Sequence, residues 1–146
     1  MTRRMVLSVV IHGMFLFVVG LVLGLTLHRT LVAQGAPEAE RAWRASHTTL
    51  VTGGTFYLAL AAVGHLLVLG ERAARLATGA LALASYVFAA VFVAGPLLGA
   101  RGLEPVGPPA HVAVYAGFVF GILLLFVATL VFSWGAWAAY RASRAA

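Results

Sequence analysis

Four long apolar runs, separated by short polar stretches, dominate the pattern of the chain. They cover residues 5–27, 47–69, 76–98 and 111–140. A helix needs about 20 apolar residues to cross the hydrocarbon core of a bilayer. Each run is long enough and is apolar on all sides, which favours spanning helices over amphipathic surface helices. Because lipid offers no partner to unpaired backbone groups, the pattern predicts an all-α integral membrane protein, a four-transmembrane-helix bundle.

The polar stretches between the runs predict three connections of unequal length. Residues 28–46 form a long polar link whose second half holds good helix formers, so the second helix is expected to cover about 40–69. Residues 70–75 predict a tight turn, and residues 99–110, rich in Gly and Pro, predict a loop. No soluble domain is expected, and the chain is predicted to be a single membrane domain, 1–146.

The composition agrees with lipid as the solvent. The chain is 62% hydrophobic and 10% charged, whereas soluble domains carry about 25% charged residues. It has no cysteine, which excludes disulfides, thiolate catalysis and zinc-thiolate sites. The ten basic residues are all arginines, and they stand singly or in pairs between the apolar runs. Since they form no basic stripe, nucleic acid is not an expected partner.

The arginines predict an orientation in the membrane. Six lie on one side of the predicted bundle: Arg3, Arg4, Arg72, Arg75, Arg141 and Arg144. Four lie on the other side: Arg29, Arg41, Arg44 and Arg101. Cytoplasmic segments are the arginine-rich ones, so we expect a multi-pass protein of a bacterial inner membrane with both termini in the cytoplasm. A signal-peptide cleavage site near residues 33–35 is the alternative, but the first apolar run is too long for a signal peptide.

Two pairs of glycines allow close helix contact. Gly20 and Gly24 form one GxxxG step, and Gly117 and Gly121 form another. Small residues at this spacing let two helix backbones approach. The steps predict close packing without naming the partner helix.

The histidines are the candidate residues for binding a metal or a haem iron. They are His12, His28, His47, His65 and His111. No acidic residue lies within an apolar run, so transport through a carboxylate relay is not expected. Imidazole binds metals and haem iron. His28 and His111 are expected at the lipid headgroups, while a zinc or copper site formed by His28, His47 and His111 stays an alternative.

Arg41, Trp43 and Arg44, which precede His47 in the sequence, are candidates for contact with a cofactor. Arg41 and Arg44 lie roughly on the side of His47 if the helix continues upstream. Guanidinium groups suit haem propionates, although ordinary interfacial arginines would have the same placement. Trp43 is either an interfacial anchor or a wall beside the cofactor.

Several short motifs, at a shared spacing, resemble one known family. They are His12-Gly13, Trp43 four residues before His47, Gly53-Gly54, Ala74-Arg75-Leu76, and Arg101-Gly102-Leu103 followed by Gly107. With these motifs the chain resembles the styrene oxide isomerase family of four-helix membrane proteins over most of its length. The separations from His47 to Arg75 and from Arg75 to Arg101 fit that family without gaps.

The resemblance implies a homotrimer with haem b near the subunit interfaces and His47 as the axial iron ligand. Trp43 stands where the family has a tryptophan before its haem ligand, whereas the family's arginine near the ligand is shifted here to Arg44. The family's reaction opens an aryl epoxide on ferric iron and shifts a hydride to give an aldehyde. Iron acts there as a Lewis acid without net redox change.

The chain departs from the family at two polar positions. Gly53 stands where the family has an asparagine, and Phe92 stands where it has a tyrosine. Tyr57, Tyr86 and Thr52 are the candidates to replace them. We therefore expect a haem site with weak isomerase activity toward a small apolar epoxide.

Other functions stay open. The haem site would also suit a small ligand such as a diatomic gas. His12 and His65 lie at similar depth and would clamp a second haem in an electron-transfer protein of the cytochrome b kind. A haem-free structural protein is the last alternative.

Overall fold

The computed structural model describes residues 1–100 and 102–144. Its elements are, in chain order, α1 (Arg3–Val32), α2 (Pro37–Val63), the 3-10 turn η1 (Gly64–Leu66), α3 (Glu71–Leu98) and α4 (Pro109–Ser143). No strand occurs among the described residues. The four α-helices are each long and apolar enough to cross a membrane. The predicted all-α, four-helix membrane bundle is confirmed.

The first connection is much shorter than the sequence pattern predicts. The helices extend past the apolar runs, so that only residues 33–36 join α1 to α2. Pro37 occupies the first turn of α2, where its missing N–H costs no hydrogen bond. Glu38 and Glu40 lie in the same turn, where their negative charges stabilise the helix by interacting with the positive end of its dipole. These local signals begin the helix before the membrane, as expected, and slightly earlier than predicted.

The second connection differs from its prediction in position. Helix α2 ends at Val63 rather than near residue 69, and residues 71–75 belong to α3 rather than to a tight turn. The chain crosses between them in residues 67–70, where the N–H of Val68 donates to the carbonyl of Gly135 at 3.2 Å. A Cβ at Gly135 would lie 2.7 Å from Cγ of Leu69, so this glycine makes room for the connection on α4.

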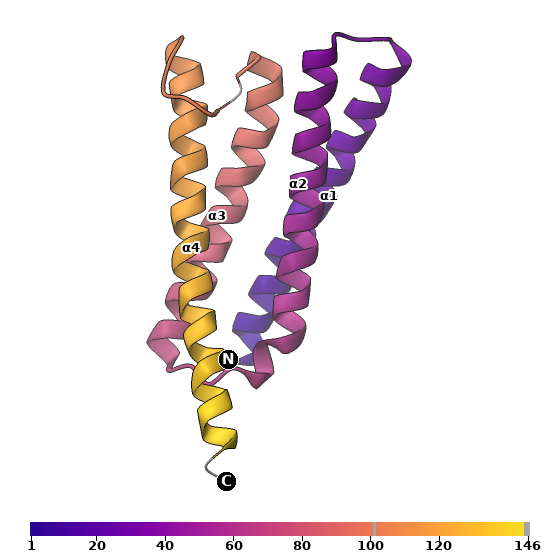
Figure 1. Ribbon diagram of the computed structural model, residues 1–146. Helices are drawn as coiled ribbons and strands as arrows, with labels where there is room; N and C mark the ends of the chain where they lie inside the picture. Colours follow the sequence, from indigo (N-terminus) through magenta and orange to yellow (C-terminus); the bar gives the residue numbers. More distant parts are fainter. Residues whose placement is uncertain (101, 145–146) are drawn as a thin grey trace.

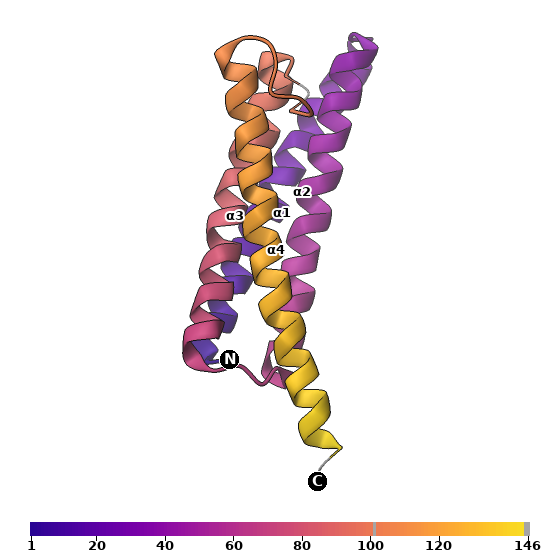
Figure 2. The same ribbon diagram turned by 60° about the vertical axis from the view of Figure 1, so that its left-hand side comes forward.

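The bundle consists of two helical hairpins. Helix α1 packs along α2 and α3 packs along α4, while α3 also contacts α1 and α2 and so joins the pairs. Figures 1 and 2 show the hairpins diverging toward the end with the 33–36 connection, opposite the two termini.

Both glycine steps are used inside the chain. Gly20 lies against α2, where an added Cβ would approach the backbone N of Val51 at 2.8 Å. Gly121 faces α3, where an added Cβ would lie 2.8 Å from Cε1 of Phe88. The two steps therefore close the two hairpins, and neither is free to pair with a second copy.

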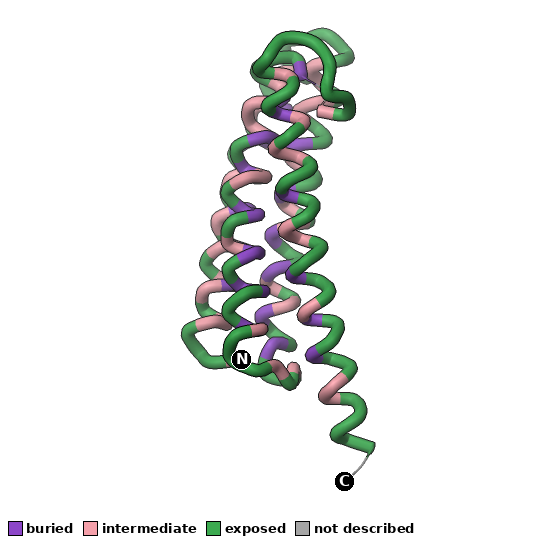
Figure 3. Tube along the Cα trace, turned by 90° about the vertical axis from the view of Figure 1, so that its left-hand side faces the viewer, coloured by how far each residue is buried: buried purple, intermediate pink, exposed green. Residues whose placement is uncertain are grey.

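The buried residues form a narrow stripe along the bundle axis, as Figure 3 shows. Its most buried side chains include Val9, Leu16, Leu50 and Leu81, each at most 2% exposed. Large apolar side chains cover the outer surface, which is the arrangement that a surrounding of lipid requires.

Candidate functional site

The imidazole of His47 is half-buried between α2 and α1. Its Nδ1 lies 2.8 Å from the carbonyl oxygen of Gly20. Because a carbonyl only accepts, Nδ1 must carry the proton of the neutral ring. Nε2 then has a free lone pair, and no described residue forms a hydrogen bond with it. An imidazole held in this way is prepared to bind a metal through Nε2.

Gly24 makes room for this ring. A Cβ at this position would lie 2.9 Å from Nδ1 and 3.0 Å from Cε1 of His47. Any other residue would push the ring away from the Gly20 carbonyl. The glycine step of α1 thus forms a slot for His47, a role that its sequence spacing alone does not reveal.

The arginines near His47 already have partners. Arg41 pairs with Glu38 at 2.8 Å, and Arg44 pairs with Glu40 at 2.6 Å. Exposed ion pairs at this helical spacing contribute about 0.3–0.5 kcal/mol to stability. A more strongly bound anion would therefore displace the carboxylates. Trp43 is half-buried and packs against the core. The predicted haem contacts of these three residues stay predictions.

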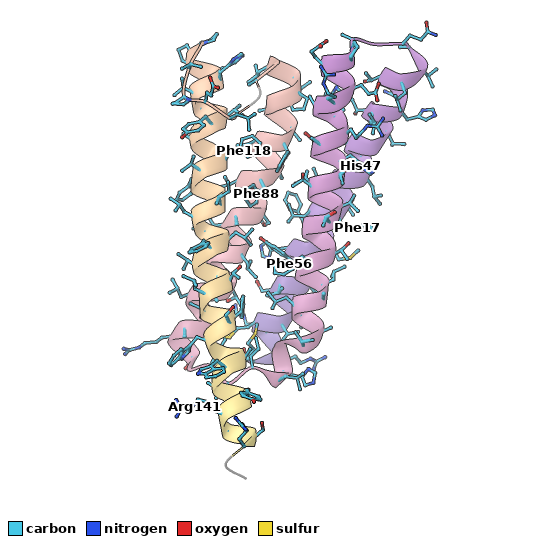
Figure 4. The ribbon with its side chains drawn as sticks, viewed as in Figure 1. Phe17, His47, Phe56, Phe88, Phe118 and Arg141 are labelled. Atoms are coloured by element: carbon cyan, nitrogen blue, oxygen red, sulfur yellow. The ribbon has the colours of Figure 1, made fainter. Side chains whose placement is uncertain are left out.

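A pocket of about 660 Å³ lies between the hairpins, in the size range of small-molecule sites. We call it the α2–α4 pocket. Its lining residues are Leu16, Thr48, Thr49, Leu50, Thr52, Gly53, Phe56, Tyr57, Phe88, Phe92, Phe118, Ile122, Leu125 and Thr129. No charged side chain is among them, so the pocket suits an uncharged ligand. Figure 4 shows Phe56, Phe88 and Phe118 gathered between the hairpins.

The predicted pocket candidates divide into two groups. Gly53, Tyr57 and Phe92 line the α2–α4 pocket, and so does Thr52. The Tyr57 hydroxyl donates to the carbonyl of Leu81 at 2.9 Å and is therefore already used. Tyr86 lies outside the lining of this pocket and is 54% exposed. Tyr86 thus does not replace the missing tyrosine there.

Two further histidines are held by their own segments. His12 donates through Nδ1 to the carbonyl of Ser8, 2.7 Å away, and its ring meets Tyr86 edge-on at 5.4 Å. His65 lies exposed on η1, with Nδ1 3.0 Å from the carbonyl of Ala62. A second haem between them stays a prediction.

The described residues do not bring together the three histidines of the alternative metal site. Nε2 of His111 lies 3.0 Å from the carbonyl of Leu98, so this ring ties the loop before α4 to the end of α3. His28 is exposed near the end of α1. Within residues 1–100 and 102–144 no group of three or more His, Asp or Glu residues could hold a metal ion. Similar depth in the membrane therefore does not place His28, His47 and His111 in one metal site.

His47 and the α2–α4 pocket lie on different sides of α2. His47 and Thr52 are five residues apart, which is about 140° around a helix. The His47 ring points to α1, whereas Thr52 and Gly53 face the space toward α3 and α4. Figure 4 places His47 on the α1 side of α2, away from the labelled phenylalanines of the pocket. One chain therefore holds the His47 ring and the pocket on separate sides of the same helix.

Sequence reasoning missed most of the pocket lining. Thr49, Thr52 and Phe56 follow one face of α2, and Phe118, Ile122, Leu125 and Thr129 follow one face of α4. Their spacings of three and four residues are visible in the sequence. Such spacings become a pocket only when the angle between the hairpins is known.

Part of one resemblance motif lies outside the described residues. Arg101 falls there, and Gly102 and Leu103 next to it belong to the loop before α4.

Comparison with known proteins identifies one family. A model of the family described as styrene oxide isomerase matches residues 5–137 of the chain. Searches of curated proteins and of solved structures find no match.

Proposed function

The chain belongs to the styrene oxide isomerase family, and from this premise we propose that it is a membrane haem b protein that isomerises a small apolar epoxide. His47 is the proposed axial ligand. When bound, haem iron would supply Lewis acidity toward the epoxide oxygen without a net redox change.

The observation that carries this proposal is the hydrogen bond between His47 and Gly20. Backbone carbonyls commonly fix the tautomer and raise the basicity of metal-binding histidines in this way. Nδ1 is committed to the carbonyl at 2.8 Å, which leaves Nε2 as the donor atom for iron. The slot at Gly24 supports the same function, because it holds the ring in one orientation.

The pocket residues would act by excluding water and orienting the substrate. Phe56, Phe88 and Phe118 provide apolar walls against which an aromatic ring packs. Neither Gly53 nor Phe92 has a side-chain donor, so these positions cannot form the two hydrogen bonds that the family resemblance implies. We therefore propose slow isomerisation, since transition-state hydrogen bonds contribute strongly to rate.

The separation of His47 from the α2–α4 pocket suggests how two subunits would share one site. A trimer, which the family resemblance implies, would place His47 of one subunit beside the α2–α4 pocket of the next. Such a site explains why His47 and the pocket occupy separate sides of α2.

Binding of a small ligand without turnover is the second candidate function. It is favoured by the apolar residues at positions 53 and 92, which leave an open iron site without the groups that orient an epoxide.

The proposal is tested by absorption spectra of detergent-purified protein, oxidised and reduced. The wild type is expected to carry about one b-type haem per chain, and His47→Ala is expected to lose it while still inserting. The controls His28→Ala and His111→Ala are expected to keep haem, because His28 is exposed and the His111 ring is bonded to the carbonyl of Leu98. A colourless wild type after expression with ample haem, or full haem in His47→Ala, would sink the proposal, and two haems per chain would favour electron transfer.

A further inference from the structure

Threonines in membrane helices normally hide their hydroxyls by donating to a carbonyl one turn earlier. Four threonines of this chain do so. Thr30, Thr48, Thr55 and Thr78 each donate to the carbonyl four residues before, at 2.8–2.9 Å. This bond satisfies the hydroxyl where no water is at hand.

Three threonines of the α2–α4 pocket behave differently. Thr49, Thr52 and Thr129 line the pocket, and their hydroxyls form no hydrogen bond with the described residues. The other helix threonine without such a bond is Thr26, in α1. Among the helix threonines that the structure describes, three of the four without such a bond therefore line one apolar pocket.

Thr52 lies beside a position of the pocket wall that has no side chain. Its neighbour Gly53 has no side chain, and a Cβ there would meet only Cδ1 of Leu16, at 3.8 Å. An oxygen atom of a ligand has room at this position to accept the Thr52 hydrogen. The aromatic walls across the pocket include Phe92 and Phe118, whose rings meet edge to face at 4.8 Å.

We propose that Thr52 is the hydrogen-bond donor by which the α2–α4 pocket recognises an uncharged aromatic molecule with a single oxygen acceptor. Epoxides, ethers and carbonyl compounds belong to this class. The inference rests on the proposed function in assigning the pocket to substrate, and it adds a residue whose hydroxyl serves where Gly53 has no polar side chain. Binding through Thr52 itself does not require haem.

The test uses two unreactive probes of the same shape, 2-phenyltetrahydrofuran and cyclopentylbenzene, which differ by one oxygen. Their affinities for the purified full-length protein are measured by ligand-observed NMR. One hydrogen bond corresponds to a preference of about fivefold for the ether. Thr52→Val is expected to abolish this preference and to leave the affinity for cyclopentylbenzene unchanged, because valine keeps the shape of threonine.

Two variants control the experiment. Thr55→Val removes a hydroxyl of the same helix that is bonded to Val51 and lies outside the pocket, so the preference stays. Thr52→Ser keeps a hydroxyl and keeps the preference. Equal binding of both probes by the wild type, no binding of either, or an unchanged preference in Thr52→Val overturns the inference.

Haem content, read from the absorption spectrum of each sample, separates this inference from the proposed function. A colourless protein that still prefers the ether supports the role of Thr52 and contradicts haem binding. A haem-loaded protein without the preference for the ether supports haem binding and contradicts the role of Thr52.

Discussion

Nδ1 of His47 is bonded to α1 while Nε2 is left for the proposed iron, and this division gives single residues of α1 an influence on the proposed site. Gly20 offers the carbonyl that takes the Nδ1 proton, and Gly24 offers the space in which the ring lies. Neither glycine would touch the cofactor through a side chain. Their effect passes entirely through the orientation of the imidazole.

Gly24→Ala tests this effect. The new Cβ would lie 2.9 Å from Nδ1, so the ring must leave the Gly20 carbonyl. Haem affinity is expected to fall about 10- to 100-fold, as on loss of other groups that orient a metal ligand. Haem per chain, titrated by absorption, measures the change. Gly121→Ala is the matched control, because its Cβ meets the Phe88 ring at 2.8 Å, far from His47, and haem retention equal to that control would contradict the slot.

Restoring the two polar groups tests the interpretation of the pocket. Gly53 has room for a side chain, and Phe92 is a half-buried ring of the same pocket. The variant with Gly53→Asn and Phe92→Tyr is expected to turn over styrene oxide about 100-fold faster than the wild type, since one transition-state donor is worth that much. Aldehyde formation measures the rate. Gly53→Leu, of similar volume but apolar, should give no gain, and a wild type already as fast as the double variant would count against this account.

At the scale of helices, Tyr57 cross-links the two hairpins. Its hydroxyl donates to the Leu81 carbonyl, so α2 and α3 are held at a defined angle beside the pocket. Tyr57→Phe removes only this bond. The free energy of unfolding is expected to drop by about 0.6 kcal/mol, an average value for a hydrogen bond between membrane helices.

Unfolding in detergent, followed by circular dichroism, measures the loss. Tyr86→Phe is the control, because its hydroxyl has no hydrogen bond with the described residues. An equal loss in both variants would show that the cross-link contributes nothing.

The helices themselves could be predicted from the sequence, but not their ends. Apolar length identifies a span, whereas a helix continues into the headgroup region as long as its backbone bonds close. After α2 ends at Val63, the chain is bonded through Val68 to Gly135, which is distant in the sequence. For the same reason the partner of His47 escaped prediction, because a backbone carbonyl such as that of Gly20 leaves no trace in residue identity.

At the scale of the whole molecule, charge is distributed unevenly along the bundle. Both termini lie at one end, as Figure 1 shows, with six arginines at that end. A reporter fused after Ala146 is therefore expected to report a cytoplasmic location, according to the positive-inside rule. Green fluorescent protein should fluoresce there and alkaline phosphatase should stay inactive. Active phosphatase at the C-terminus would invert the proposed orientation.

The subunit number is the second prediction at this scale. Because the glycine steps are used within the chain, the trimer rests on the separation of His47 from the pocket and on the family resemblance. Native mass spectrometry in a mild detergent is expected to show three chains with about three haems. A stable, haem-loaded monomer would contradict a site shared between subunits.

The order of synthesis determines when the His47 slot can form. Gly20, Gly24 and His47 all belong to α1 and α2, so nothing from α3 or α4 is needed to form it. Chains emerge from the ribosome with the amino-terminal part first. The ring is therefore expected to be seated in the bilayer while the second hairpin is still being translated. Cross-linking between cysteines placed on α1 and α2 of stalled nascent chains measures this timing, and a link that appears only on full-length chains would refute it.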